Sequence, residues 1–487
     1  MKTSACILTV FIIFLDVVHP FDPLLILDND NAGSDKCFCQ LEGKIDDCMC
    51  NVDTVDYFNN MKIFPRLQSL LQKDFFRYFK YNANKPCPFW NNFADRCKNP
   101  GCGVKPCTKE EIPPGLISEP CQKEESAQLD NEVDVTISEQ ARADLKSWTD
   151  FDNSQGQFCE LDPDDNCPDC DYVDLTRNPE RFTGYSGEAT HRIWRAIYEE
   201  NCFKPPVTTT SPTKAAAFSA AFFPKSLESM CLEKRAFYRA ISGLHSSITV
   251  HLTAQHPEGT ADQKSNNLFP GVGNSQAYGP NLPLFLSRFD PDTTNGMGPF
   301  WLKNIYFVYL MELRAITKAA PYLENHPFFT GNDEEDKETR IAVKEVLNLM
   351  RSFPDQFDES SMFKSGKKTE MQALKAEFRD HFLNISRVMV CVSCDKCKLW
   401  GKLQITGLGT ALKILFSSDE NGIATKDHMM TPDKVFLNAS NVKLDDSLVA
   451  GLKLSRNEIV ALFNAFGRLS TSIQQLERFR RMLSQAN

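Results

Sequence analysis

The cysteines constrain this chain more than any other residue type. The 487 residues include 18 cysteines, most of them in closely spaced groups. Because a cysteine in a disulfide or a metal site must lie beside its partner, each group restricts how its segment folds. Three cysteines are separated by two residues each, at Cys391, Cys394 and Cys397. They follow an amphipathic stretch, 369–390, and precede an apolar one, 408–416, which predicts a helix–helix junction in the core.

A C-x-x-C pair supports more than one kind of chemistry. Its thiols are one helical turn apart, so one can attack a disulfide while the other resolves the mixed species. A helix N-terminus at the first thiol would lower its pKa. The same spacing also supplies half of a tetrahedral zinc site, or an ordinary structural disulfide. The motif alone leaves these three interpretations open.

The amino terminus has the pattern of a secretory signal peptide, which we place at residues 1–20. Lys2 precedes an apolar run of 11 residues, Ala5–Leu15, which is too short to cross a bilayer. No later stretch is long and apolar enough for a span, so the mature chain is expected to be luminal or secreted. An oxidising compartment suits its cysteines. The 17 that remain after Cys6 are an odd number, which leaves at least one unpaired or intermolecular thiol.

Composition and missing motifs exclude several classes of function. The formal net charge is -10, so nucleic acid is not an expected partner. There is no P-loop, no G-x-G-x-x-G at a strand–helix turn, no H-E-x-x-H and no G-x-S-x-G. Hydrolysis and phosphoryl transfer therefore have little support. Two sequons, at Asn384 and Asn438, predict N-glycosylation.

Hydrophobic periodicity predicts a mainly α-helical chain with few strands. Ser455 and Glu458 form a capping box at the start of the last helix. The helices are expected at 54–82, around 193–198, and at 226–252, 301–320, 338–352, 369–390 and 456–482.

Cysteine-rich and proline-rich loops connect the expected helices. Residues 35–50 hold four cysteines, and a nested pairing of Cys37 with Cys50 and Cys39 with Cys48 would form a hairpin-like knot. The one-residue gaps within each pair suit zinc less well than gaps of two to four. Residues 204–225 are expected to be a flexible insertion, and 254–299 a long loop that contains Arg288.

The loop at 85–121 is the most unusual, because it carries five cysteines among many prolines and glycines. It cannot form one regular element, so it is either stapled down or functional and mobile. Cys97 and Cys102 flank an Asn-Pro-Gly turn, which predicts an exposed disulfide of the labile kind. A second C-x-x-C, Cys167 and Cys170, has acidic neighbours that oppose thiolate formation, so a structural bridge is favoured there.

Several long, ordered stretches together resemble one family, the endoplasmic reticulum oxidoreductins. These are flavin-linked sulfhydryl oxidases that reoxidise protein disulfide isomerase. The resemblance covers nearly the whole mature chain. The stretches are YVDL at 172–175, NPERFTGY at 178–185, IYEENC at 197–202, KRAFYR-x-ISGLH at 234–245, and C-x-x-C-x-LWGKLQ at 394–404 with GLGTALK at 407–413.

The resemblance implies a single mainly α domain over 21–487, with FAD in a helical-bundle core. Cys394–Cys397 would be the active-site disulfide beside the flavin, and Cys97–Cys102 the shuttle disulfide on the 85–121 loop. No metal is implied. Further implied bridges are Cys87–Cys391, Cys202–Cys231 and the nested N-terminal pairs. The implied flavin contacts are Arg181, Thr183, Trp194, Ser242, His245 and Arg288.

The resemblance also implies a reaction and a place for it. Substrate dithiols would reduce the shuttle pair, which would reduce the active-site pair. FAD would then pass the electrons to O2, giving hydrogen peroxide. Protein disulfide isomerase and related thioredoxin-like proteins would be the partners, in the endoplasmic reticulum lumen, with peripheral association at the luminal membrane face allowed. Pairing of Cys97 with Cys121 and of Cys102 with Cys107 would be an off-state.

One position departs from the family pattern. Some members carry a further flavin-contacting arginine where this chain has Trp301. Two other interpretations remain, a non-enzymatic disulfide-rich binding protein and a zinc-dependent structural module. Either would be colourless when purified, whereas a flavoprotein is yellow.

Overall fold

The structure is a computed structural model. It describes residues 38–89, 97, 99–117, 170–185, 188–203, 227–257, 278–353, 357–364, 367–416 and 454–485. The predicted signal peptide, the insertion at 204–225, Asn438 and the cysteines Cys37, Cys121, Cys159 and Cys167 lie outside these residues. Within the described ranges, no helix combines the length and the apolar character needed to cross a bilayer.

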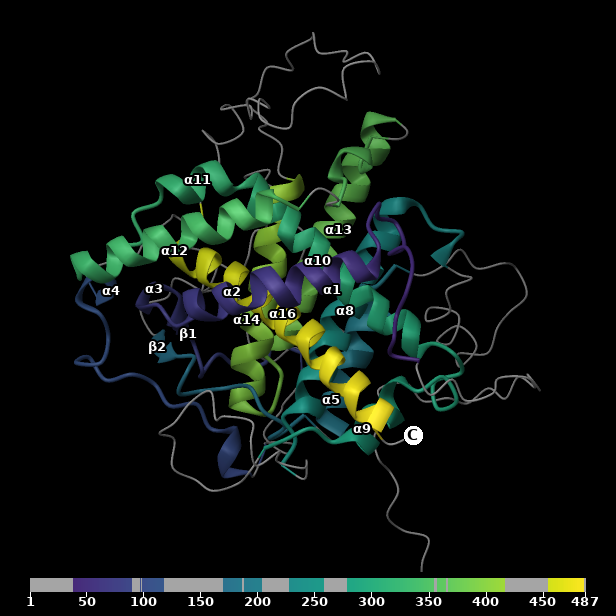
Figure 1. The fold of residues 1–487 in the computed structure, drawn as a ribbon, viewed down its shortest axis with the longest axis horizontal. Coiled ribbons are helices and arrows are strands. Elements are labelled where there is room, and N and C mark those ends of the chain that lie inside the picture. The colour runs from purple at the N-terminus through teal and green to yellow at the C-terminus, as the bar shows by residue number, and fades with distance from the viewer. Residues whose placement is uncertain are drawn as a thin grey trace, which may run out of the picture.

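Four long helices form the core, and the predicted mainly α class is confirmed (Figure 1). They are α8 (Leu232–Ala254), α10 (Gly298–Lys318), α14 (Asp395–Phe416) and α16 (Arg456–Gln485). Along α10, every side chain from Ile305 to Leu313 is at most 1% exposed. A helix that is buried on all sides lies at the centre of its domain.

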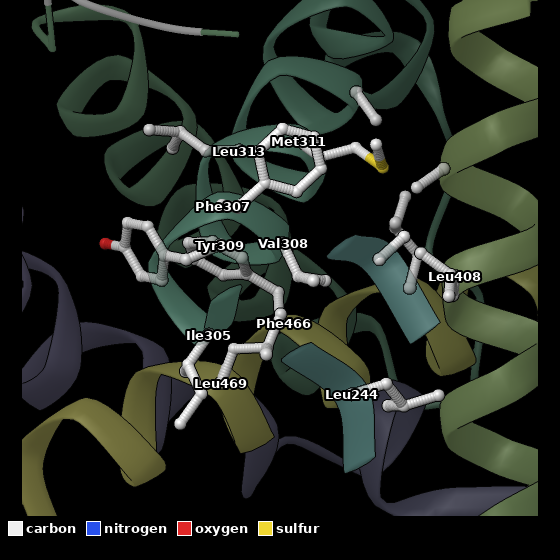
Figure 2. Close-up of a cluster of buried hydrophobic side chains, with 14 of the residues drawn as sticks. Leu244, Ile305, Phe307, Val308, Tyr309, Met311, Leu313, Leu408, Phe466 and Leu469 are labelled. Atoms are coloured by element: carbon white, nitrogen blue, oxygen red, sulfur yellow. The ribbon is translucent and has the colours of Figure 1, made fainter. Parts of the chain in front are cut away.

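Side chains from all four helices meet around α10 (Figure 2). Leu244 comes from α8, Leu408 from α14, and Phe466 and Leu469 from α16. Helices α14 and α16 approach closely at Gly407, where an added Cβ would lie 2.5 Å from the carbonyl oxygen of Ala461. This close crossing holds α14, whose first turn carries Cys397, against the longest helix.

The predicted capping box at the start of α16 is confirmed, since the Glu458 amide donates to Ser455 Oγ at 3.2 Å and the Ser455 amide donates to Glu458 Oε2 at 2.7 Å.

Smaller helices surround this core. The surrounding elements are α1 (Val52–Phe58), a π-helix (Asn59–Ile63), α2 (Phe64–Leu71), α3 (Asp74–Arg77), α4 (Pro114–Ile117), α5 (Glu188–Arg195), a π-helix (Ala196–Glu200), α9 (Leu282–Phe289), α11 (Ala320–Asn325), α12 (Asp333–Arg351) and α13 (Lys368–Met389), with 3₁₀ turns at Pro100–Cys102 and Glu359–Ser361.

Two expectations about these elements were wrong. The helix predicted over 54–82 is broken into segments and ends in a strand, β1 (Tyr78–Tyr81), which pairs antiparallel with β2 (Asp171–Asp174). Aromatic residues favour strands once a partner strand is present, so the pairing overrides the helical period. The loop predicted over 254–299 contains α9, capped by Asn281, whose Oδ1 accepts from the Leu284 amide at 2.9 Å.

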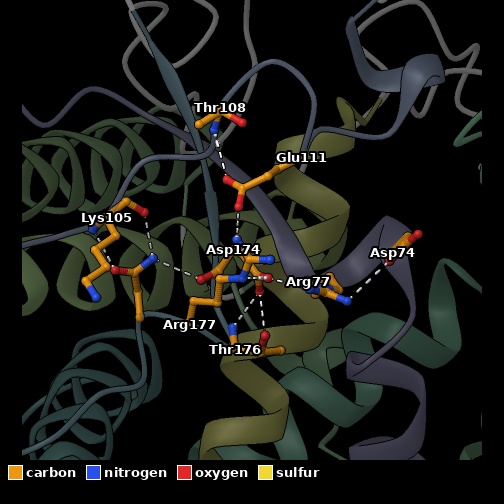
Figure 3. Close-up of polar contacts among 9 residues, drawn as sticks. Asp74, Arg77, Lys105, Thr108, Glu111, Asp174, Thr176 and Arg177 are labelled. Carbon is orange, nitrogen blue, oxygen red and sulfur yellow. Dashed lines mark hydrogen bonds and ion pairs between the residues drawn. The ribbon is translucent and has the colours of Figure 1, made fainter. Parts of the chain in front are cut away.

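The two-stranded sheet anchors the second half of the 85–121 loop (Figure 3). The Cys107 amide donates to the Tyr172 carbonyl at 2.8 Å, and the Lys105 amide donates to Asn178 Oδ1 at 2.8 Å. Glu111 pairs with Arg177, next to the buried Asp174. These contacts hold the chain that follows Cys102 against β2 and the turn after it.

Candidate active site

Two disulfides lie in contact at the start of α14. One joins Cys394 to Cys397 and the other joins Cys97 to Cys102, the pairings that the resemblance implies. The sulfurs of Cys97, Cys102 and Cys394 all lie within 4.8 Å of one another. All three are in disulfides, so none of them is a thiolate that could bind zinc. The arrangement suits exchange between one disulfide and the dithiol form of the other.

The first active-site cysteine lies at a helix N-terminus. The Lys398 amide donates to the Cys394 carbonyl at 2.8 Å, and the Cys397 amide donates to Cys394 Sγ at 3.3 Å. Thr183 Oγ1 lies 3.7 Å from the same sulfur. Cys394 is therefore at a helix N-terminus, which is the condition under which the motif predicts that the dipole favours a thiolate at the first cysteine.

A third disulfide, Cys87–Cys391, ties the beginning of the 85–121 loop to the segment before α14, as the resemblance implies. Its sulfurs link positions 304 residues apart. The loop is therefore held at both ends, by this bridge before Cys97 and by the β2 contacts after Cys102. Between the two anchors it reaches the active-site disulfide.

A buried polar network lies next to the Cys397 carbonyl. Sequence analysis made no prediction for its residues. Tyr185 donates to Glu180 Oε1 at 3.0 Å and lies 3.4 Å from the Cys397 carbonyl oxygen. Glu180 also forms a buried ion pair with Arg468 of α16, whose guanidinium lies over the Trp400 ring at 4.9 Å. Burial raises the pKa of Glu180, and the Arg468 charge opposes that rise. The only sequence signal was that Glu180 and Tyr185 belong to the NPERFTGY stretch.

A second group of predicted residues lines the interface of α5, the π-helix after it and α8. The Trp194 indole stacks on the His245 imidazole, with ring centroids 3.5 Å apart. His245 Nδ1 lies 3.0 Å from the Tyr198 hydroxyl. Burial, with a smaller contribution from the Arg288 charge, lowers the pKa of His245 to about 3. The imidazole is therefore neutral at neutral pH.

Arg288 carries a buried charge that lacks a full set of partners. Its Nη1 is buried and donates no hydrogen bond within the described part of the chain, and burial lowers its pKa to about 10. Such a guanidinium is suited to an anion such as a phosphate. This is the observation that best fits a nucleotide cofactor.

The remaining predicted contacts lie at the two ends of this region. The Arg181 guanidinium lies 4.6 Å from the Tyr278 ring centroid, and Ser242 Oγ accepts from Asn304 Nδ2 at 3.0 Å. Trp301, at the departing position, is buried on α10. The segment that bears Arg181 and Thr183 lies against the C-terminal end of α8, because the Phe182 amide donates to the Gln255 carbonyl at 3.2 Å.

Some predicted bridges are not formed. Cys202 and Cys231 are both free thiols, which contradicts the expected pair: Cys202 is buried, whereas Cys231 is exposed at the N-cap of α8. Cys48 is also a free thiol, so the Cys39–Cys48 bridge is absent. Burial keeps its thiol neutral by raising its pKa to about 12. The Cys37–Cys50 pair cannot be placed, because Cys37 lies outside the described residues.

The off-state pairing is not the one that this structure contains. Cys102 is bonded to Cys97, and Cys107 is a thiol. Cys121 lies outside the described residues. The sequon at Asn384 falls within α13, where its side chain is 6% exposed; its glycosylation stays a prediction.

The helical core and the two disulfides in contact define the protein as a mainly α-helical thiol–disulfide oxidoreductase. A model of the family described as Endoplasmic Reticulum Oxidoreductin 1 (ERO1) matches residues 62–476. The chain belongs to this family, as its motifs predicted.

Relatives and a solved structure agree with this assignment. The chain is 45% identical over 464 residues to ERO1-like protein alpha of Mus musculus, covering 93% of each chain. It is 43% identical over 503 residues to the Ero1-like protein of Drosophila melanogaster, covering 99% of this chain and 97% of the relative. It is similar in fold to Ero1p, described as a "Source of Disulfide Bonds for Oxidative Protein Folding in the Cell", with a TM-score of 0.55, 27% identity, and coverage of 89% of this chain and 98% of Ero1p.

Proposed function

We propose that this protein is an FAD-dependent thiol oxidase that generates disulfides for protein folding, with O2 as acceptor and hydrogen peroxide as product. The observation that carries the proposal is the contact between the Cys97–Cys102 and Cys394–Cys397 disulfides. One disulfide alone could be structural. Two redox-type pairs whose sulfurs meet can pass electrons from one to the other.

Exposure assigns an order to the exchange. Cys97 is half-buried, whereas Cys102 is 3% exposed. A substrate thiolate therefore attacks Cys97, the Cys97–Cys102 bond breaks, and Cys102 leaves as a thiolate. The second substrate thiolate attacks the mixed disulfide, which forms the substrate disulfide and releases Cys97. The two substrate protons pass to solvent.

The second exchange returns the shuttle pair to its oxidised form. The Cys102 thiolate attacks Cys394, and Cys397 leaves as a thiolate. Cys97 then attacks Cys102, the Cys97–Cys102 bond forms again, and Cys394 leaves as a thiolate. Two electrons now reside on the active-site pair, where the helix N-terminus stabilises the charge at Cys394.

The residues present fit FAD. Arg288, with its buried unpartnered Nη1, would hold a phosphate, and Trp194 and His245 would hold an aromatic ring system and its polar edge. Thr183 and Arg181 would lie at the end near the active-site disulfide. When bound, FAD would supply the two-electron chemistry that links thiols to O2, which thiols perform poorly on their own.

We propose the endoplasmic reticulum lumen as the location, and protein disulfide isomerase or a related thioredoxin-like protein as the substrate. The predicted signal peptide and the cysteine content support the compartment. The need for a shuttle supports a protein substrate, since a folded partner cannot reach Cys394, which is 0% exposed.

Purified protein tests the proposal directly. It should be yellow, and it should consume O2 when given reduced isomerase. Replacing Cys394 or Cys397 with Ala should abolish turnover. Cys97→Ala should spare the oxidation of small dithiols more than that of isomerase. A colourless protein that contains stoichiometric zinc would contradict the proposal.

A further inference from the structure

The segment between the two disulfides contains a glycine that its backbone conformation does not require. The φ angle of Gly184 is not positive, so an L-residue could adopt the same backbone. The restriction is spatial. An added Cβ would lie 2.6 Å from Cys394 Cβ, 2.8 Å from Cys102 Sγ and 2.9 Å from Cys394 Sγ. A methyl group at this position would occupy the space where the two sulfurs meet.

Hydrogen bonds of Asn99 and Cys97 join the turn that carries the shuttle disulfide to the segments that hold Gly184 and Cys394. The Asn99 Nδ2 donates to the Thr183 carbonyl at 3.3 Å, while its Oδ1 accepts from the Gly101 amide at 2.8 Å. On the other side, the Cys97 amide donates to the Ser393 carbonyl at 3.2 Å. Asn99 therefore shapes its own turn and joins it to the residue before Gly184.

We propose that Gly184 and Asn99 are positioning residues for the internal exchange: the absent side chain at 184 lets Cys102 reach Cys394, and the Asn99 amide holds the shuttle turn in that position. The proposal rests on the proposed function, because it concerns transfer between the two pairs. Neither residue takes part in bond making. In the step itself, the Cys102–Cys394 bond forms, the Cys394–Cys397 bond breaks, and Cys397 leaves as a thiolate.

A cross-linking experiment tests the positions without turnover, flavin or O2. In the Cys97→Ala, Cys397→Ala background, Cys102 and Cys394 are left as thiols that glutathione disulfide can oxidise to one bond, with release of two glutathione molecules. Non-reducing peptide mapping measures the rate. We expect Gly184→Ala to slow formation of the Cys102–Cys394 bond about 100-fold, since a displacement of about 1 Å has effects of that size. Asn99→Ala should slow it about fivefold, the loss of one hydrogen bond.

Gly401→Ala in the same background is the matched control. Gly401 lies in α14, and an added Cβ there would meet only the flexible Met389 side chain, with Sδ at 3.1 Å. It should cross-link at the parent rate. Asn99 is exposed, so its variant folds and remains informative if Gly184→Ala does not.

Equal cross-linking rates in Gly184→Ala, Asn99→Ala and the parent would overturn the proposal. The proposed function fails separately, if Cys394→Ala enzyme still turns over or if the protein binds no flavin. In otherwise unmodified protein, both positioning variants should slow isomerase oxidation in the same order as they slow cross-linking. Their flavin content should be unchanged, which a general loss of structure would not allow.

Discussion

The Trp194 indole lies flat against the His245 imidazole, with an interplanar angle of 15°. Complete burial keeps that imidazole neutral, with its pKa lowered to about 3. The unfolded chain binds a proton at His245 near pH 6.5, and the folded chain does not. The contribution of His245 to the free energy of unfolding is therefore fully present above pH 6.5, and it is lost progressively as the pH falls toward 3.

We expect the free energy of unfolding to fall by about 1.4 kcal/mol per pH unit from His245 below pH 6.5. Burial lowers the pKa of His251 and of His326 too, so they add losses of the same sign. Urea titrations at several pH values should show that the free energy of unfolding depends less steeply on pH for His245→Gln than for the parent. The difference in slope should correspond to the uptake of about one proton on unfolding. Identical slopes would contradict the burial assigned to this ring.

Replacing Arg288 should change the stability of the apoprotein and its affinity for FAD in opposite directions. In the absence of flavin, Arg288→Met removes a buried charge with an unpartnered nitrogen, so the apoprotein should become more stable by about 1 kcal/mol. FAD affinity should fall about 100-fold, because a charge-assisted contact is lost. Thermal unfolding of apoprotein and flavin titration measure the two effects. Arg288→Lys is the matched control, and it should keep part of the affinity.

The Glu180–Arg468 pair should stabilise the site only as a pair. Arg468→Met leaves a buried carboxylate without its cation and should cost about 3 kcal/mol. The double variant Glu180→Gln, Arg468→Met should recover more than half of that loss, since no charge is left uncompensated. Chemical denaturation measures both variants. If the double variant is less stable than Arg468→Met, the pair is not coupled as the geometry indicates.

Cys202 and Cys231 should differ in reactivity. An alkylating reagent added to native protein should modify the exposed Cys231 and leave Cys202 unmodified, because burial shields that thiol and raises its pKa. In denaturant without reductant, both should react. Peptide mass mapping distinguishes the sites. A Cys202–Cys231 disulfide would leave both unmodified in denaturant, and it would restore the bridge that the family resemblance implied.

The sequence alone predicted the mainly α class and the spacing within each cysteine pair, because that information is local, and the long motifs predicted the family. The two-residue gap between Cys394 and Cys397 implies one helical turn wherever the segment lies. The apolar period of α8 places Ser242 and His245 on one face for the same reason. The Asn-Pro-Gly turn between Cys97 and Cys102 is also a property of neighbouring residues.

Only the tertiary structure decided which of these local features meet. Periodicity does not show that Cys87 pairs with Cys391, because the two are 304 residues apart. Nor does it show that a side chain at position 184 would overlap Cys394 and Cys102. The strand β1 exists because β2 is beside it, although its own residues read as helix. Distances between distant segments depend on how α8, α10, α14 and α16 pack together. That packing brings the Glu180–Arg468 pair beneath the active-site disulfide and the shuttle sulfur within reach of Cys394.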